Sequence, residues 1–154
     1  MRIRVLWEGK TKDPHLRAMV KEYSDRIARF NEIVVEDVSE TKRIRSGKSK
    51  RLLPVESRML EKLDASTKVL LDPQGFEWSS QKFAEWLGGQ GLHGTREVAF
   101  IVGGPEGFSP EFRSKADLLL SLSRLTLTHE WARALLLEQI YRGFTILRGF
   151  PYAR

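Results

Sequence analysis

The sequence predicts a single α/β domain built around a mostly parallel β-sheet with helices on both faces. Five short apolar segments with strand character alternate with segments of helical periodicity, an order typical of parallel sheets. Two of these segments contain continuous apolar runs, Val69 to Leu71 and Val98 to Val102, which indicate strands that are buried on both faces. With 154 residues, the chain is long enough for one such core and too short for two full domains.

The first part of the chain is predicted to contain two strands and two helices. Residues Arg2 to Trp7 are β-formers and make the first strand. A helix from Asp13 to Phe30 starts with a capping carboxylate and a proline, and it carries one apolar stripe. Glu32 to Val38 is the second strand, and Pro54 to Asp64 has the spacing of the second helix.

The second part is predicted to contain three strands and three helices. In chain order these are a strand at 68–72, a turn at 73–75, a helix from about 79 to 87, a strand at 98–102, a helix at 109–116, a strand at 118–122 and a helix at 129–147. We expect Gly88 and Gly89 to end the first of these helices, because glycine commonly terminates a helix.

The composition excludes several classes of protein. With 41% hydrophobic and 30% charged residues, the chain is too apolar to be disordered, and no run approaches the roughly 20 apolar residues of a membrane span. The absence of cysteine excludes disulfides and thiolate metal sites, and three scattered histidines offer no metal-ligand spacing, so we expect no metal. The N-terminus lacks a secretory signal, which makes a cytoplasmic location the expectation.

The formal net charge of +6 favours a polyanionic partner such as nucleic acid. Positive residues concentrate at 42–51, where Lys42, Arg43 and Arg45 begin a run without any acidic residue. This run has the charge to neutralise several phosphates, or it is an ordinary solvated loop. The tail at 148–154 combines arginines with aromatic residues, which suits either stacking on an unpaired base or packing on the core.

Two loops that follow predicted strands are the best candidates for a small-molecule site. Gly103 to Gly107 is rich in glycine, which lets a backbone approach a ligand closely. Leu122 to Thr128 alternates leucine with polar residues and offers apolar walls and backbone groups to a flat ring. Each loop is equally well explained as a strand-to-helix connection. The pair is more informative, because parallel strands end at one edge of a sheet, where such folds bind ligands.

The last predicted helix is apolar over an unusually wide arc, which includes Trp131, Leu135, Leu136, Ile140 and Phe144. An ordinary surface helix has a narrower apolar stripe. Either this helix is central in the fold, or a second subunit covers its outer face. We favour a homodimer.

Three blocks of this sequence, in this order, resemble the RlmH family. They are Ile101 to Pro110 (IVGGPEGFSP), Ser121 to His129 (SLSRLTLTH), and Arg133 followed by Glu138 to Arg142 (EQIYR). Members of this family are SPOUT-class methyltransferases that act on a pseudouridine of bacterial 23S ribosomal RNA. The resemblance extends over essentially the whole chain, including the opening strand and the basic loop.

The resemblance implies a SPOUT-type sheet whose C-terminal part, roughly residues 68–154, binds the methyl donor and is threaded as a trefoil knot. It implies that the donor is S-adenosylmethionine and that the homodimer packs through the last helix. The resemblance, together with the glycine loop described above, gives the expected donor site. Its residues are Leu71, Gly103, Gly104, Ser123, Arg124, Leu125, Thr126, Leu127 and Thr128.

The implied reaction is methyl transfer to N3 of the pseudouridine, whose imide proton must leave during the attack. Tyr152, Arg154 and His129 are the expected catalytic residues, as proton acceptor or stabilising cation, and Glu106 is a further candidate. An assembled ribosome is the expected substrate, because so small a chain has little surface with which to select one base. We expect RNA contacts from five basic residues: Lys42, Arg43, Arg45, Arg133 and Arg142.

The C-terminal tail departs from the family pattern. RlmH-like tails read His-Pro-Tyr-His and a basic residue, whereas this chain ends Phe150-Pro151-Tyr152-Ala153-Arg154. A base role for a tail histidine therefore cannot be carried over to this chain. Two other interpretations stay open: a non-catalytic RNA- or ribosome-binding protein on the same scaffold, and a small-molecule-binding protein whose charge is incidental.

Overall fold

A computed structural model of the chain describes residues 1–38 and 51–152. These residues form a five-stranded sheet in the order β2-β1-β4-β3-β5, in which every pair of neighbouring strands is parallel. The strands are β1 (Arg2–Glu8), β2 (Ile33–Val38), β3 (Thr67–Glu77), β4 (Glu97–Val102) and β5 (Leu118–Ser121). The helices are α1 (Pro14–Ala28), α2 (Pro54–Lys62), α3 (Ser80–Leu92), α4 (Pro110–Ser114) and α5 (His129–Arg148). The predicted α/β class is confirmed, and the sheet is parallel throughout these strands.

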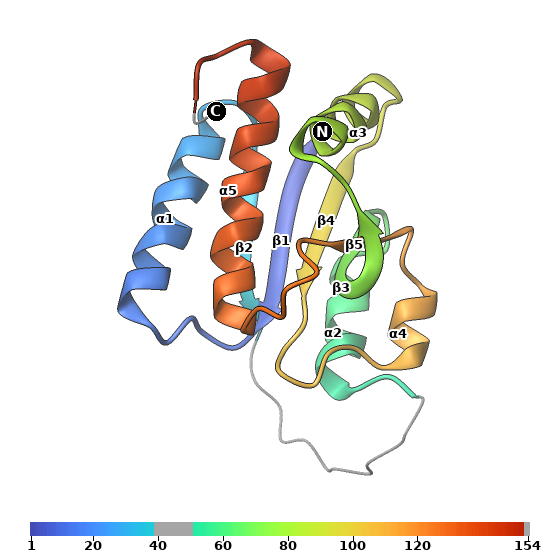
Figure 1. Cartoon of the computed structure of the whole chain (residues 1–154). Helices are drawn as coiled ribbons and strands as arrows, with labels where there is room; N and C mark the ends of the chain where they lie inside the picture. The colour runs from blue at the N-terminus through green and yellow to red at the C-terminus, as the bar shows by residue number, and fades with distance from the viewer. Residues whose placement is uncertain (39–50, 153–154) are drawn as a thin grey trace.

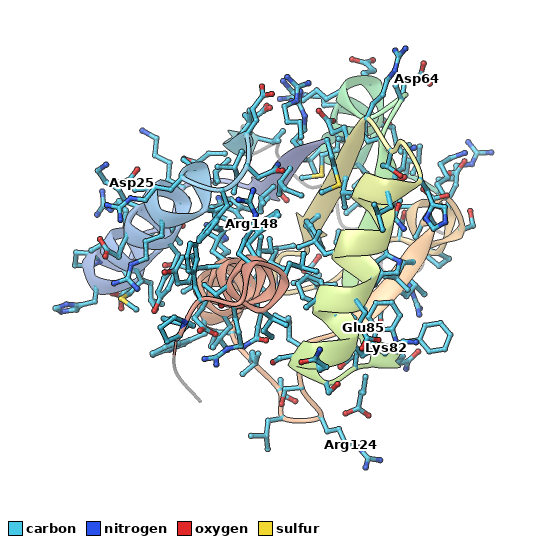
Figure 2. The ribbon with its side chains drawn as sticks, turned by 90° about the horizontal axis from the view of Figure 1, so that it is seen from above. Asp25, Asp64, Lys82, Glu85, Arg124 and Arg148 are labelled. Carbon is cyan, nitrogen blue, oxygen red and sulfur yellow. The ribbon has the colours of Figure 1, made fainter. Side chains whose placement is uncertain are left out.

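Helices cover both faces of the sheet, as the apolar strands predicted. One buried cluster joins β1 and β4 to α1, α3 and α5, and a second joins the opposite face of the same strands to α2 and α4. The alternation is visible in β4, where Val98 and Phe100 belong to the first cluster and Ala99 and Ile101 to the second. Helix α5 lies between α1 and α3, so the last helix is central in the fold (Figures 1 and 2).

Local sequence explains where most helices begin. The side chain of Asp13 accepts hydrogen bonds from the backbone at the start of α1, and Ser79 and Ser109 do the same for α3 and α4. Thr128 caps α5, and Gly149 ends it in the left-handed conformation, with φ 68°. The start of α5 is also tied to α1, because the Glu130 carboxylate accepts bonds from two backbone N–H groups in the connection before α1.

Two predicted boundaries were wrong. Strand β3 does not end at residue 72 but continues through the predicted turn to Glu77, with a shift of its register on β5 between Leu71 and Phe76. Helix α3 does not stop at Gly88 but continues to Leu92. A Cβ atom on Gly88 would lie 2.7 Å from the Leu147 side chain. Gly88 therefore allows α3 to approach α5 closely and does not end the helix.

Among the residues that the structure describes, no helix is both long and apolar enough to cross a membrane.

The second part of β3 approaches β5 so closely that only glycine fits at position 75. A Cβ atom there would lie 2.5 Å from the carbonyl carbon of Leu119. Backbone atoms of a paired strand cannot move without cost, so we expect Gly75→Ala to lower the free energy of unfolding by about 1–3 kcal/mol. Urea denaturation measures this change.

The matched control is Gly91→Ala, since a Cβ atom on Gly91 would meet nothing within 4 Å. Alanine is also the better helix former, so this variant should be as stable as the wild type or up to about 1 kcal/mol more stable. Equal stability of the two variants would contradict the close approach of β3 to β5.

Candidate active site

One pocket lies beside the middle of β3, where its register on β5 shifts, and at the carboxyl ends of β4 and β5. There the two loops singled out in the sequence meet the start of α5. Its volume is about 490 Å³. Parallel strands of an open α/β sheet bind ligands at this edge. The pocket is lined by Leu71, Asp72, Pro73, Val102, Gly103, Gly104, Pro105, Gly107, Ser121, Leu122, Ser123, Leu125, Thr126, Leu127, Thr128, His129 and Ala132.

Eight of the nine residues expected at a donor site line this pocket. The exception is Arg124, whose side chain is 88% exposed and lies 3.4 Å from the Glu77 carboxylate. Figure 2 shows Arg124 pointing away from the body of the molecule. Its neighbours in the loop face the pocket while Arg124 faces solvent, so its side chain cannot contribute to this site in the structure described.

The sequence reasoning missed one ionisable wall residue, Asp72. Its carboxylate lies 2.8 Å from Nε of Arg113 on α4 and also accepts a hydrogen bond from the backbone N–H of Gln74. Asp72 is the last residue of the predicted third strand, at the edge of the sheet where parallel strands place their ligands. That position was the signal that could have identified it.

Hydrogen bonds within the two loops hold the walls of the pocket. The Ser121 hydroxyl donates to the Ser123 carbonyl, and the Ser123 hydroxyl accepts from the backbone N–H of Leu125. In the glycine loop, the backbone N–H of Gly107 donates to the Gly104 carbonyl. The pocket is therefore shaped by local turns, between which leucine side chains form apolar walls.

His129, the first residue of α5, is the expected catalytic residue that the structure places in the pocket. Burial lowers the pKa of its imidazole, and the nearby positive charges of Arg133 and Lys12 lower it further, against the opposing effect of Glu130. The imidazole is therefore neutral at pH 7, and a neutral imidazole can accept a proton.

Tyr152 does not lie in this pocket. It packs on Tyr141 and its hydroxyl is 2.9 Å from that of Tyr23. Tyr141 is twelve residues beyond His129, a distance of about 18 Å along a helix. Burial raises the pKa of the Tyr152 hydroxyl, as do its hydrogen bonds with Tyr23 and Glu138. Tyr152 is thus poorly suited to accept a proton, and within one chain it cannot act together with His129.

The structure also places Arg133 differently from the prediction. Its side chain is buried, at 1% exposure, and donates hydrogen bonds to the Thr11 hydroxyl and the Glu8 carbonyl. Its guanidinium lies over the ring of Trp7. Arg133 therefore joins α5 to the end of β1, and its side chain presents almost no surface to RNA in this arrangement.

The remaining predicted residues lie outside the pocket or outside the described residues. Arg142 pairs with Glu138 and covers the ring of Tyr152, at the far end of α5. Glu106 is exposed on the glycine loop and is not among the lining residues. The predictions for Lys42, Arg43, Arg45 and Arg154 concern residues that the structure does not describe.

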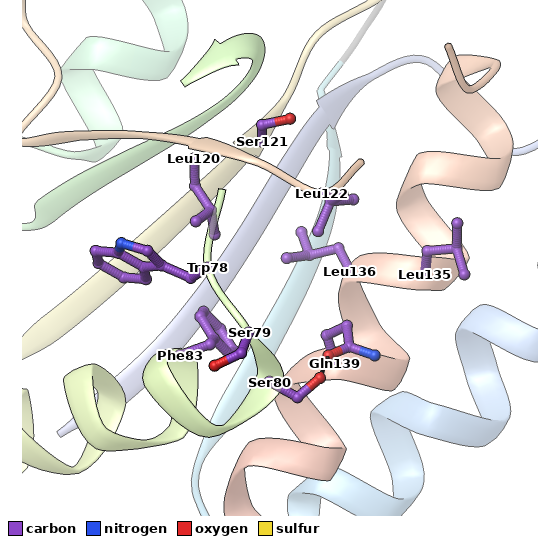
Figure 3. Close-up of a pocket in the computed structure, with 10 residues that line it drawn as sticks. All are labelled: Trp78, Ser79, Ser80, Phe83, Leu120, Ser121, Leu122, Leu135, Leu136 and Gln139. Carbon is purple, nitrogen blue, oxygen red and sulfur yellow. Dashed lines mark hydrogen bonds between the residues drawn. The ribbon is translucent and has the colours of Figure 1, made fainter. Parts of the chain in front are cut away.

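A second, smaller cavity of about 210 Å³ adjoins the first and shares Ser121 and Leu122 with it. Figure 3 shows its walls, which come from the start of α3, the end of β5 and the middle of α5. At its edge, the Ser80 hydroxyl donates a hydrogen bond of 2.6 Å to the side-chain oxygen of Gln139.

Comparisons with known proteins show the family of this chain. A family model described as "Predicted SPOUT methyltransferase" matches residues 1–153 of the chain. This chain belongs to the SPOUT methyltransferases. Curated relatives of this family member carry the name ribosomal RNA large subunit methyltransferase H. Those from Trichlorobacter lovleyi and Geotalea daltonii are 40% and 41% identical to it, with 99% of both chains covered in each case.

A more distant relative, from Clostridium kluyveri, is 38% identical over 99% of each chain and carries the same name. Among solved structures, a probable methylase family protein from Haemophilus influenzae superposes with a TM-score of 0.59. The superposition covers 99% of this chain and 70% of that one at 11% identity, so it supports the fold alone.

In this SPOUT methyltransferase, the described residues contain no group of three or more His, Cys, Asp or Glu side chains that could hold a metal ion.

We predict that His129 of this SPOUT methyltransferase titrates below the ordinary imidazole value of 6.5. Lys12→Met should move the midpoint upward, because it removes one of the positive charges that disfavour the imidazolium. NMR titration of the imidazole in the wild type and this variant measures both effects. A wild-type midpoint at or above 6.5, or a downward movement in Lys12→Met, would contradict the described environment of His129.

Proposed function

We propose that this protein transfers a methyl group from S-adenosylmethionine to N3 of a pseudouridine in 23S ribosomal RNA, on the assembled ribosome in the cytoplasm. The observation that carries the proposal is the meeting of two loops, 103–107 and 122–128, in one pocket of a chain that belongs to the SPOUT methyltransferases. The relatives named ribosomal RNA large subunit methyltransferase H support the choice of substrate.

The pocket has the properties that an adenosine-containing donor requires. Its volume of about 490 Å³ lies within the range of small-molecule sites. Leu71, Leu122 and Leu127 provide apolar contact for a flat ring, and the loop backbones provide hydrogen-bonding groups for its edges. The Asp72 carboxylate adds an acceptor for donor hydroxyl groups at the same wall.

When bound, the donor supplies a methyl group that its sulfonium already activates, so the proposed reaction needs no metal. The contribution of the protein is then mainly to hold the reactants in line. His129, the first residue of α5, lies in the same pocket. Because its pKa is lowered, the imidazole is neutral at pH 7 and can take the imide proton of the target base.

The proposed RNA contacts come from Lys42, Arg43 and Arg45 and from Arg142 near the tail. The net charge of +6 supports this assignment, since contacts with phosphate dominate the affinity of most RNA-binding proteins. Because Arg133 is buried, its role in the proposal is to hold the start of α5 and not to bind phosphate.

We also propose that the protein acts as a homodimer packed through α5. Trp131 and Leu135, one turn apart on this helix, are 55% and 36% exposed. Leu135 also lines the smaller cavity. Burial of such a surface favours association. Tyr152 packs on Tyr141, which is about 18 Å along α5 from His129, so a catalytic role for Tyr152 requires the pocket of the second copy.

We further propose that residues 68–154 form the donor-binding part and are threaded as a trefoil knot. Two features support the threading. Strand β5 lies at the edge of the sheet beyond β3, whereas the helix that follows it packs between α1 and α3. The connecting loop therefore returns across the carboxyl ends of the strands and meets the glycine loop in the pocket (Figure 1).

The alternative function is that of a non-catalytic RNA- or ribosome-binding protein on the same scaffold. It is favoured by the tail, in which Phe150 and Ala153 stand where RlmH-like tails have histidines. This alternative predicts RNA binding that weakens with salt and no methyl transfer.

We predict transfer of labelled methyl from S-adenosylmethionine to ribosomes that lack the modification. Naked 23S RNA serves as the parallel substrate and should accept far less label, because only the particle presents the base in its folded surroundings. Mapping the product should identify N3 of one pseudouridine. If the protein binds the donor but transfers no methyl group to either substrate, the proposed enzyme activity is contradicted. The non-catalytic RNA-binding function would then be supported.

We predict that Gly104→Val weakens the binding of S-adenosylmethionine at least about tenfold, because a branched side chain prevents the backbone from approaching the ligand. Isothermal titration calorimetry of the folded variant measures this loss. Gly91→Ala, on α3 and outside the pocket, has open space on its Cβ side and should bind as the wild type does. If Gly104→Val binds S-adenosylmethionine with unchanged affinity, the glycine loop is not part of the donor site.

A further inference from the structure

The glycine loop has a second side, which faces away from the donor pocket toward the start of α2. Gly103, Gly104 and Gly107 line the proposed donor pocket, and the same three glycines border a crevice whose other wall includes Leu53 and Glu56. Contacts on the α2 side of the glycine loop therefore determine the shape of the wall that the loop presents to the donor pocket.

The group that holds it is the carboxylate of Glu56, which is buried at 2% exposure. One oxygen accepts hydrogen bonds from the backbone N–H of Leu53, at 2.8 Å, and from the Ser109 hydroxyl, at 2.6 Å. The other oxygen accepts from the backbone N–H of Ser109, at 2.9 Å. A single side chain thus connects the start of α2 to the end of the glycine loop.

The connection continues from Ser109 to the glycines. The Ser109 hydroxyl also accepts a hydrogen bond from the backbone N–H of Phe112, so the first turn of α4 is fixed to the same point. The neighbouring Phe108 packs edge-on against Phe112 and lies so close to Gly103 that a Cβ atom there would be 3.3 Å from its ring. Movement of Ser109 would therefore move the ring that supports Gly103.

From these contacts we infer that Glu56 is a positioning residue for methyl-donor binding: it holds the glycine loop in its binding shape from the side opposite the ligand. The inference rests on the proposed function, since it takes the loop as one wall of the donor site. A ligand binds more weakly to a protein whose binding-competent conformation is only partly populated. Loss of the anchor should therefore raise the dissociation constant of the donor without changing the reacting groups.

The test is Glu56→Gln, which keeps the shape of the side chain. An amide has one accepting oxygen and one donating NH₂ group, so in either orientation it faces a backbone N–H group with another donor. We expect the dissociation constant of S-adenosylmethionine, measured by calorimetry, to rise about tenfold. In the methyl transfer assay, KM for the donor should rise by a similar factor, while kcat and KM for the ribosome stay within about twofold.

The matched control is Glu111→Gln on α4. The Glu111 carboxylate accepts a hydrogen bond of 2.9 Å from the backbone N–H of Leu52, next to Leu53, but this bond is exposed and does not involve the glycine loop. The control should bind the donor as the wild type does. A merely structural role for Glu56 would lower the melting temperature and leave the dissociation constant of the folded protein unchanged, which overturns the inference.

A second variant covers the case in which Glu56→Gln does not fold. Ser109→Ala removes the hydroxyl but keeps the backbone bond to Glu56, and it should weaken donor binding about threefold. Unchanged affinity in this variant also overturns the inference. Failure of the wild type to bind S-adenosylmethionine overturns the proposed function and the inference together, whereas equal binding by wild type and Glu56→Gln overturns the inference alone.

Discussion

The parallel pairing of all five described strands is the constraint on which the rest of this structure depends. A parallel strand can be followed by its neighbour only after the chain has crossed a face of the sheet, so helices must cover both faces. The same constraint brings every carboxyl end to one edge. Loops 103–107 and 122–128 are separated in sequence by α4 and β5, yet this geometry places them in one pocket.

Much of this arrangement could be predicted from local sequence. Continuous apolar runs such as Val98 to Val102 indicate strands buried on both faces, and β4 is indeed buried along its whole length. Capping residues such as Asp13 and Thr128 mark helix starts because their side chains satisfy backbone groups nearby in sequence. The two loops could be proposed as a pair because each follows a strand, and the carboxyl ends of parallel strands lie at the same edge of a sheet.

Local sequence is a weaker guide where contacts between residues distant in the sequence decide the outcome. Gly88 suggests a helix end, but its role depends on Leu147 of another helix. Arg133 suggests a phosphate ligand, but its side chain is buried and donates hydrogen bonds to Glu8 at the end of β1 and to Thr11 beyond it. Glu56 has the local pattern of an ordinary capping residue, and only its contact with Ser109, 53 residues away, connects it to the glycine loop. A one-dimensional pattern contains no information about such partners.

The central claim is that the pocket between the glycine loop and the 122–128 loop binds the methyl donor. A crystal structure of the protein with S-adenosylmethionine tests it most directly. We expect the adenine ring between these two loops, against the leucines of the pocket and close to the backbone of Gly104. A donor found instead in the cavity beside Trp78 and Gln139, with this pocket empty, would contradict it.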